Sequence, residues 1–220
     1  MTALNAFAVR DGVHLFTDGG WHNPDTGELL GIGNKVCALP EYNAVIAATG
    51  SNLVADLLSR YLIENRFADL QSLAVMMPDW LQACIEQAKA APGGRDWGVF
   101  DVILAGWSEA TGPIIRLCKS YEDGGWPAYT RKEPTGYMRP ALEFKHTRDG
   151  SPNKRWETVP PEWGLNILRL QRTTPCVDPA GNQRFVVHGF AQHSHVGPQG
   201  ISMRVLEHWP DAIGKSPEQP

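Results

Sequence analysis

The fold of this 220-residue chain is decided by its opening stretch, Thr2-Ala3-Leu4-Asn5-Ala6-Phe7-Ala8-Val9-Arg10-Asp11-Gly12-Val13-His14-Leu15-Phe16-Thr17-Asp18. Apolar residues recur on both sides of Asp11-Gly12, and an Asp-Gly pair between two strand-like runs is a strong signal for a β-hairpin. The stretch therefore predicts two antiparallel strands, over residues 3–10 and 13–18, joined at this turn.

Short apolar runs and helical periodicities alternate along the rest of the chain. Apolar residues spaced by three and four predict one helix around Leu53–Leu62 and a second around Leu73–Ala88. Pro78 either kinks the second helix or marks its start. A short third helix is predicted over residues 161–172. Further strands are predicted over residues 28–32, 35–39, 44–49, 97–107, 112–119, 184–192 and 200–208.

Residues 121–160 show no such period. Gly, Pro, Lys and Arg interrupt this stretch, and aromatic residues are scattered through it. Long segments without regular structure are unusual inside a compact domain, so residues 121–160 are interpreted as an irregular insertion with a functional or interface role. The whole is interpreted as a single domain over residues 1–210 with a loose C-terminal tail over residues 211–220.

Composition argues against several classes of partner. The 20 basic and 24 acidic residues give a formal net charge of -4, which favours neither nucleic acid nor an anionic membrane. No run approaches the about 20 apolar residues of a membrane-spanning helix, and no signal peptide is visible. We therefore expect a cytoplasmic protein with no nucleic-acid or membrane partner. Wide cysteine spacing is typical of thiols in a reducing compartment, and the four are Cys37, Cys84, Cys118 and Cys176.

Three residues near the start form the minimal set for an N-terminal nucleophile. If Met1 is removed, Thr2 carries both a hydroxyl and a free α-amine, and the amine can take the hydroxyl proton. An α-amine titrates close to neutrality, which suits it to this task. Lys35 would supply a local positive charge, and Asp18 would pair with Lys35 and fix its position.

Several segments together resemble the proteasome β-subunit and HslV-type peptidase family. The opening hairpin carries part of the resemblance, with Asp18 at the family's spacing from the threonine and Lys35 one residue later than that spacing. The strand and turn over residues 44–51 and the hairpin built from residues 101–107 and 112–117 carry the rest. The match covers residues 2–120, with a weaker echo near residues 183–209. It implies an α+β fold: an Ntn-hydrolase-like four-layer sandwich of two antiparallel β-sheets flanked by helices, with a reduced second helical layer.

The resemblance also implies an activity. Thr2 would be the nucleophile of a proteasome-like threonine hydrolase that cleaves amide or peptide bonds, tuned by Asp18 and Lys35. Gly50 would present its backbone N–H to the oxyanion at a helix N-terminus. The resemblance further implies a peptide-like substrate and a homo-oligomer, and it calls for no cofactor.

Each of these residues also has an ordinary structural interpretation. Thr2 is a common second residue, Lys35 and Asp18 could form a surface lysine and a strand-end cap, and Gly50 suits any strand-to-helix turn. The family's small polar residue and Arg after the Asp are replaced by Gly19-Gly20, and its supporting serine has no counterpart. The alternative is therefore a catalytically silent protein of the same fold, of cellular or phage origin, that serves as an assembly or binding subunit.

His193-Ser194-His195 raises a separate possibility, because it places two imidazoles on one side of a strand. That spacing is compatible with a metal ion. No carboxylate or cysteine completes the set in the neighbouring sequence, so no metal site is predicted.

Overall fold

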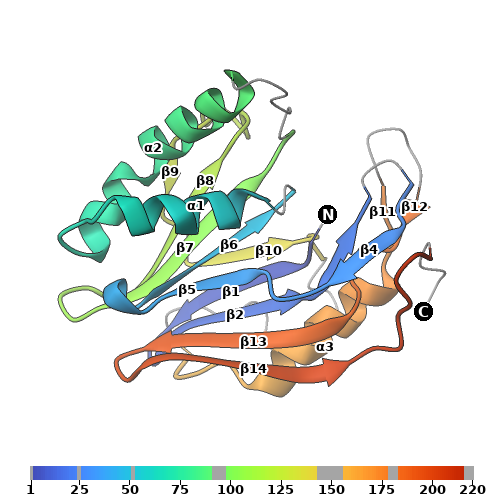
Figure 1. The fold of residues 1–220 in the computed structure, drawn as a ribbon. Helices are drawn as coiled ribbons and strands as arrows, with labels where there is room; N and C mark the ends of the chain where they lie inside the picture. Colours follow the sequence, from blue (N-terminus) through green and yellow to red (C-terminus); the bar gives the residue numbers. More distant parts are fainter. Residues whose placement is uncertain are drawn as a thin grey trace.

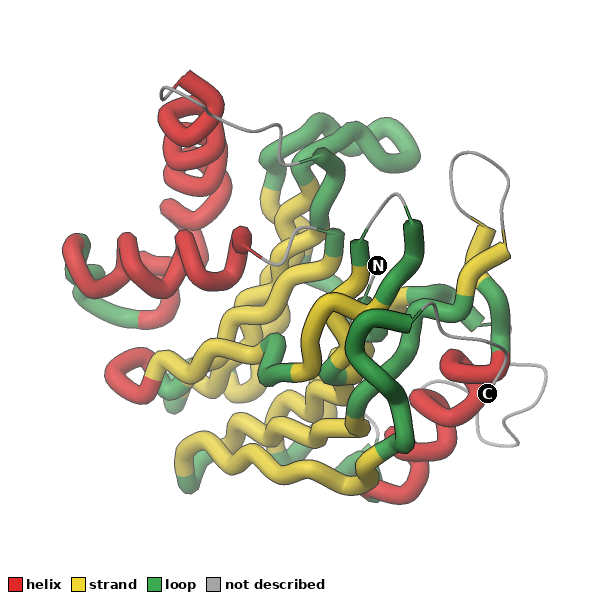
Figure 2. The backbone as a smooth tube through the Cα atoms, turned by 45° about the vertical axis from the view of Figure 1, so that its right-hand side comes forward, coloured by secondary structure: helices red, strands yellow, loops and turns green. Residues whose placement is uncertain are grey.

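The computed structural model describes residues 2–23, 26–50, 53–90, 98–142, 156–177 and 183–215. It shows a mixed α/β, strand-rich fold with several antiparallel sheets (Figure 1). Two five-stranded sheets stack on one another, and helices lie on their outer faces (Figure 2).

The first sheet contains the predicted opening hairpin. Leu4 pairs with Thr17 and Val9 with Gly12, so the predicted hairpin is present, but its two-residue turn is Arg10-Asp11, one residue earlier than the predicted Asp11-Gly12. The strand order is β10-β1-β2-β13-β14, and all neighbours run antiparallel. The strands are β1 (Leu4–Val9), β2 (Gly12–Asp18), β10 (Gly136–Arg139), β13 (Phe190–Gly197) and β14 (Gly200–His208).

The second sheet has the order β5-β6-β7-β8-β9 and is also antiparallel throughout. Its strand β6 is buried along its whole length, which fits its continuous apolar sequence. The strands are β5 (Val36–Leu39), β6 (Ala44–Thr49), β7 (Asp101–Ser108), β8 (Gly112–Lys119) and β9 (Arg131–Lys132).

Three helices and two small ribbons complete the described structure. Helices α1 (Leu53–Glu64) and α2 (Leu70–Ala90) cover the second sheet, whereas α3 (Pro161–Thr173) covers the first (Figure 1). A short 3-10 helix, η1 (Pro40–Tyr42), joins β5 to β6. The ribbons pair β3 (Gly20–His22) with β4 (Leu29–Ile32), and β11 (Cys176–Val177) with β12 (Gln183–Arg184).

Alternation along the strands divides the core into three parts. Leu15 on β2 and Val45 on β6 point into the space between the two sheets. Their neighbours Phe16 and Ile46 point outward, Phe16 toward Leu168 of α3 and Ile46 toward α1 and α2. This is the period-two pattern of strands that are buried on both faces.

The structure corrects the predicted positions of some elements. The strand predicted over residues 184–192 lies further along the chain, as β13 over Phe190–Gly197. Pro78 lies inside α2 and neither starts that helix nor ends it. The predicted irregular insertion over residues 121–160 contains two short strands, β9 and β10, each an edge strand of one sheet. Residues 143–155 of that insertion lie outside the described part.

The predicted loose tail is also corrected in part. Asp211 forms a bidentate ion pair with Arg172 of α3, with oxygen to nitrogen distances of 2.7 and 2.9 Å. The Gly214 N–H donates to the Leu29 carbonyl, and the Leu29 N–H donates to the Lys215 carbonyl. Residues 211–215 are therefore attached to the body of the protein, because their backbone and side chains bond to it. Residues 216–220 lie outside the described part.

Candidate active site

Three of the four predicted site residues meet at one point. The Lys35 Nζ lies 3.1 Å from the Thr2 Oγ1 and 2.9 Å from the Asp18 Oδ1. The ammonium therefore bridges the hydroxyl and the carboxylate. Thr2 is 3% exposed, Asp18 is fully buried, and the Lys35 side chain is 4% exposed.

The strand arrangement brings these residues together from both sheets. Thr2 precedes β1, and Asp18 ends β2, at the open end of the hairpin in which Leu4 pairs with Thr17. Lys35 immediately precedes β5 at the edge of the second sheet. Because the two sheets are stacked, the contact between Lys35 and Asp18 joins one sheet to the other at this end.

The Asp18 carboxylate is held by backbone donors as well as by Lys35. Oδ1 accepts the Ala3 N–H at 2.8 Å. Oδ2 accepts the Gly20 N–H and the His188 N–H, each at 3.1 Å. Charge-assisted hydrogen bonds of this kind stabilise an ionised carboxylate and fix its orientation. Asp18 can therefore position the ammonium group of Lys35.

The electrostatic environment of Lys35 is set by two opposing effects. Burial lowers the pKa of Lys35, and the charge and hydrogen bond of Asp18 oppose that lowering. A cation held at a buried site acts through a low effective dielectric, so its influence on the Thr2 hydroxyl exceeds that of a surface lysine. The arrangement can favour loss of a proton from a group close to Thr2.

Gly50 lies at the same end of the second sheet but shows no direct contact with the other three. It directly follows β6, and Val36 of β5 pairs with Ala47 of β6. Its φ is +90°, and a Cβ at this position would lie 2.2 Å from the Val99 carbonyl oxygen. The turn therefore requires glycine for conformational and steric reasons. Residues 51–52, between Gly50 and α1, lie outside the described part.

A support for Asp18 comes from the C-terminal half of the chain, which sequence reasoning did not link to the site. Arg172 of α3 pairs with Asp211, and the Asp211 Oδ2 also accepts the Gly189 N–H at 2.7 Å. Arg172 further contacts the His188 ring at 3.1 Å. These bonds fix the backbone at His188–Gly189, and the His188 N–H points at Asp18. No local motif marks this link, because its partners lie 170 positions apart.

A second group of polar residues near the site was also missed. Asp101 is 2% exposed, accepts a hydrogen bond from the Tyr137 hydroxyl at 2.5 Å and lies 3.3 Å from the Arg139 Nε. Asp101 pairs with Thr49 across β6 and β7, and Arg139 pairs with Leu4 across β1 and β10. The group therefore lies at the same end of the two sheets as Thr2. Burial and the Asp101 charge raise the pKa of Tyr137, which keeps the phenol a donor.

His22 is a half-buried polar residue close to Lys35, and both nitrogens of its ring are buried. Neither nitrogen of its ring has a hydrogen-bond partner. Burial, followed by the nearby His188 and Lys35, lowers the pKa of His22 to about 3. The ring is therefore neutral across the physiological range, and it adds no positive charge to that of Lys35.

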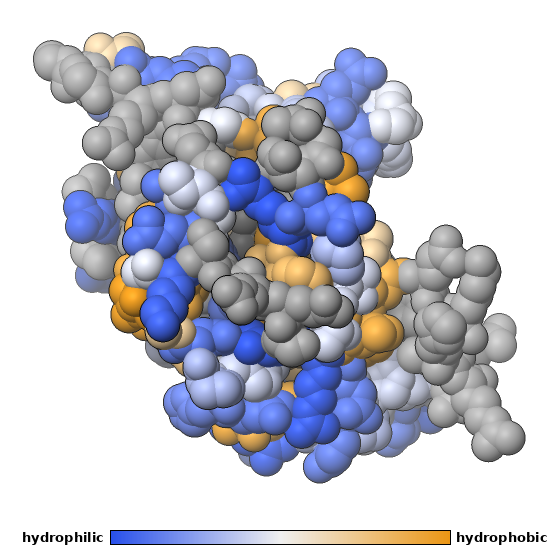
Figure 3. Space-filling model, turned by 90° about the vertical axis from the view of Figure 1, so that its right-hand side faces the viewer, coloured by the Kyte–Doolittle hydropathy of each residue, from blue (hydrophilic) through white to orange (hydrophobic). Residues whose placement is uncertain are grey.

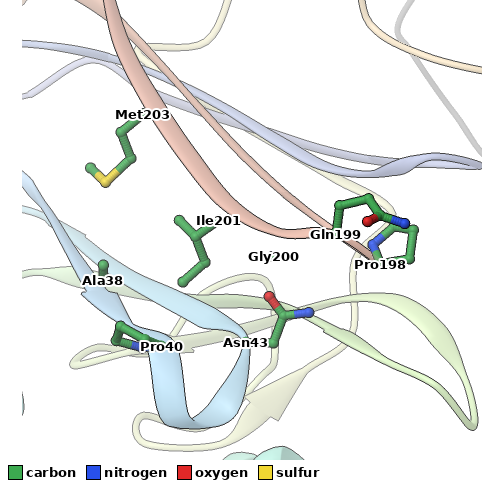
Figure 4. Close-up of a pocket in the computed structure, with 8 residues that line it drawn as sticks. All are labelled: Ala38, Pro40, Asn43, Pro198, Gln199, Gly200, Ile201 and Met203. Atoms are coloured by element: carbon green, nitrogen blue, oxygen red, sulfur yellow. The ribbon is translucent and has the colours of Figure 1, made fainter.

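The described surface has a hollow of about 630 Å³ away from this site (Figure 4). It lies at the far end of β5 and the start of β14, where Ala38, Pro40, Ile201 and Met203 line it. None of the four predicted site residues lines it, so the hollow is not the place where Thr2 would meet a substrate.

The site end of the stacked sheets faces the viewer in Figure 3, on the side toward which β3, β4, β11 and β12 project. Apolar surface appears there in patches between polar residues. Among the described helices, none has both the length and the apolar character needed to cross a membrane.

No protein-family model and no curated protein matches this chain.

Proposed function

We propose that this chain is a proteasome-like hydrolase with an N-terminal threonine nucleophile, in an Ntn-type four-layer sandwich. The observation that carries the proposal is the buried Lys35 ammonium, which contacts both the Thr2 Oγ1 and the Asp18 carboxylate. Two stacked antiparallel sheets with helices outside them are compatible with that fold. The proposal requires removal of Met1, which lies outside the described residues.

The first chemical step is attack by Thr2. The α-amine of Thr2, freed by loss of Met1, takes the proton from Oγ1 as the oxygen attacks the substrate carbonyl. Lys35 donates a hydrogen bond to Oγ1 and stabilises negative charge as it develops there. Asp18 holds Lys35 in place, so the cation is already positioned before the reaction begins.

The remaining steps release two products. The protonated α-amine gives its proton to the leaving amine, and an ester forms between Oγ1 and the acyl group. Water then attacks this ester with the same amine as base, which regenerates Thr2. The Gly50 N–H is the proposed donor to the oxyanion at both attacks, because Gly50 directly follows β6, whose partner strand β5 begins just after Lys35.

The substrate class proposed is a peptide or peptide-like amide, and the proposed state is a cytoplasmic homo-oligomer without a cofactor. These follow from the resemblance of residues 2–120 to proteasome β-subunits. The group formed by buried Asp101, partly buried Tyr137 and exposed Arg139 at the same end adds polar side chains that could orient a peptide backbone.

The deciding experiment is intact mass spectrometry of the protein with and without a peptide epoxyketone or β-lactone. We expect loss of Met1 and a single probe adduct, which Thr2→Ala abolishes. Thr17→Val is the matched control, because Thr17 is also buried and next to Asp18 but its hydroxyl has no partner. A protein that keeps Met1 and takes up no probe would contradict the hydrolase.

One observation favours the alternative, a silent subunit that assembles or binds. Trp126 is 52% exposed and lies under the Lys132 ammonium, 5.1 Å from the ring centroid. Exposed tryptophans often anchor interfaces. If the alternative holds, Thr2→Ala retains full biological function and Trp126→Ala does not. The opposite pattern supports the hydrolase.

A further inference from the structure

A second group of chemically active side chains lies at the opposite end of β2 from Thr2. Asp11 occupies the hairpin turn that precedes β2, and His14 follows on the strand. His195 lies directly across from His14 in the pairing of β2 with β13. With a rise of about 3.4 Å per residue, the four residues from His14 to Asp18 along β2 span roughly 14 Å, and Asp11 lies further away still. The group therefore belongs to a different site.

The ligand atoms of these three residues converge. One oxygen of Asp11 and one nitrogen each of His14 and His195 all lie within 4.8 Å of one another. The His14 Nε2 is 2.9 Å from the Asp11 Oδ1, and the His195 Nε2 is 4.0 Å from the Asp11 Oδ2. Zn²⁺ binds imidazole nitrogen and carboxylate oxygen at about 2.0–2.2 Å, so small side-chain movements would bring all three atoms into range.

A buried histidine stands behind His14 in the position of an orienting partner. The His193 Nε2 lies 3.0 Å from the His14 Nδ1, and both rings are buried. In the tautomer whose Nδ1–H donates to His193, the His14 Nε2 has a free lone pair for a metal ion, whereas in the other tautomer the Nε2–H donates to Asp11. Metal-bound histidines almost always donate their other N–H to such a partner.

The carboxylate is held in place before any ion arrives. The Asp11 N–H donates to the Glu157 carbonyl at 3.0 Å, and the Thr158 side chain bonds to the Asp11 carboxylate. The Asp11 side chain is 36% exposed and that of His195 is 27% exposed, whereas that of His14 is 4% exposed. Solvent therefore reaches one side of the group, which leaves room for a water ligand and a path of entry.

We infer that Asp11, His14 and His195 form a binding site for a divalent transition-metal ion such as Zn²⁺, with His193 as the residue that orients His14. Two histidines and one carboxylate plus water would give the ion four ligands. A metal ion bound there would cross-link the β1–β2 turn to strand β13. The inference does not depend on the proposed hydrolase, since the two sites lie at opposite ends of the first sheet.

The test is equilibrium dialysis of the tag-free, chelator-treated full chain against Zn²⁺, with metal analysis of the protein. We expect one Zn²⁺ per chain. Asp11→Asn and His195→Ala should each weaken binding by at least about tenfold, since changes to partners outside the ligand set already cost that much. Both side chains are partly exposed, so the variants should fold, and circular dichroism checks this.

His208→Ala is the matched control, because His208 is an exposed histidine on the neighbouring strand β14. It should bind Zn²⁺ as the wild type does. Two results would overturn the inference: a wild type that binds no more Zn²⁺ than the Asp11→Asn/His195→Ala double variant, or an equal loss of binding in His208→Ala. A second readout, the visible spectrum of bound Co²⁺, should change on loss of His195.

Discussion

At the scale of single residues, Lys35 and Asp18 form a buried ion pair whose partners depend on each other. Asp18 is fully buried, and the Lys35 side chain is 4% exposed. Removing one member of such a pair leaves an uncompensated charge inside the protein, which costs about 3–5 kcal/mol. The pair therefore has a structural effect that can be separated from any catalytic one.

Lys35→Met should lower the free energy of unfolding by about 3–5 kcal/mol in urea denaturation. The double variant Lys35→Met/Asp18→Asn should recover part of this loss, because the asparagine amide carries no charge that burial would leave unpaired. Arg10→Met is the control, since the Arg10–Glu157 pair is 63% and 77% exposed and such pairs contribute at most about 1 kcal/mol. Equal losses in Lys35→Met and Arg10→Met would contradict the buried pair.

His22 should make stability depend on pH. Its pKa is about 3 in the folded protein, since burial and then His188 and Lys35 lower it while Asp211 opposes them. In the unfolded chain it is about 6.5. Between these values the unfolded state binds a proton that the folded state does not, so stability falls as pH drops below about 6.5.

The His22→Phe variant should lose this contribution. Between about pH 6 and pH 4 its free energy of unfolding should fall less steeply than that of the wild type, by at most about 1.4 kcal/mol per pH unit. Urea titrations at several pH values measure both slopes. Parallel slopes would show that the ring is protonated in the folded protein.

At the scale of elements, the packing of α3 on the first sheet depends on one close approach. A Cβ at Gly164 would lie 2.0 Å from the nearest ring atom of Phe16. The helix therefore cannot carry a side chain at this position without moving away from β2. Because Arg172 of the same helix holds Asp211, such a movement would also reach the backbone that supports Asp18.

Gly164→Val should lower the free energy of unfolding by about 1–3 kcal/mol, the usual cost of overpacking. Gly31→Ala on β4 is the control, since a Cβ there meets nothing within 4 Å, and it should change stability by less than about 0.5 kcal/mol. Thermal and urea denaturation of both variants measure the difference. A Gly164→Val protein as stable as the wild type would mean that α3 can shift freely.

The sequence could predict some of the strands of this fold but not all of them. The opening hairpin and the apolar strand over residues 44–49 follow from local period and turn chemistry, and both are present, with the hairpin turn one residue earlier than predicted. The start of β13 was misplaced, because residues 184–189 are also apolar in part and only pairing with β2 decides which residues join the sheet. Strands β9 and β10 are two and four residues long, too short for any period to show.

For the candidate site, the sequence predicted the meeting of Thr2, Asp18 and Lys35 only through family resemblance. It did not predict the support of Asp18 by His188, nor the carboxylate of Asp11 beside His195. Asp18, at the end of β2, contacts a residue 170 positions away in the sequence, and Asp11, in the hairpin turn, contacts one 184 positions away. Contacts at such separations depend on the packing of whole elements, and local patterns carry no information about them.

At the scale of the whole molecule, each sheet has edge strands, and β14 is largely open to solvent along its length. Exposed edges offer unpaired backbone groups to another chain. Together with the resemblance to ring-forming subunits, this leads us to expect more than one chain per particle.

Light scattering coupled to size exclusion should therefore give a mass that is a multiple of 24.3 kDa. Val205→Lys on β14 is a useful companion variant, since a charge at an exposed edge disfavours strand addition, and it should lower the mass if this edge is used. A wild type that elutes as a single chain at all concentrations would contradict assembly.

The N–H that His188 donates to Asp18 has a consequence for the order of events during synthesis. Thr2, Lys35 and Asp18 all lie within the first 35 residues, but part of the support of the Asp18 carboxylate comes from His188, whose backbone is fixed through Asp211. Until then Asp18 lacks the His188 N–H, one of its three backbone donors, and Lys35 has an incompletely fixed partner. If the proposed hydrolase is correct, an unfinished or truncated polypeptide would therefore hold Lys35 less firmly, and full reactivity would be expected only once translation had passed Asp211.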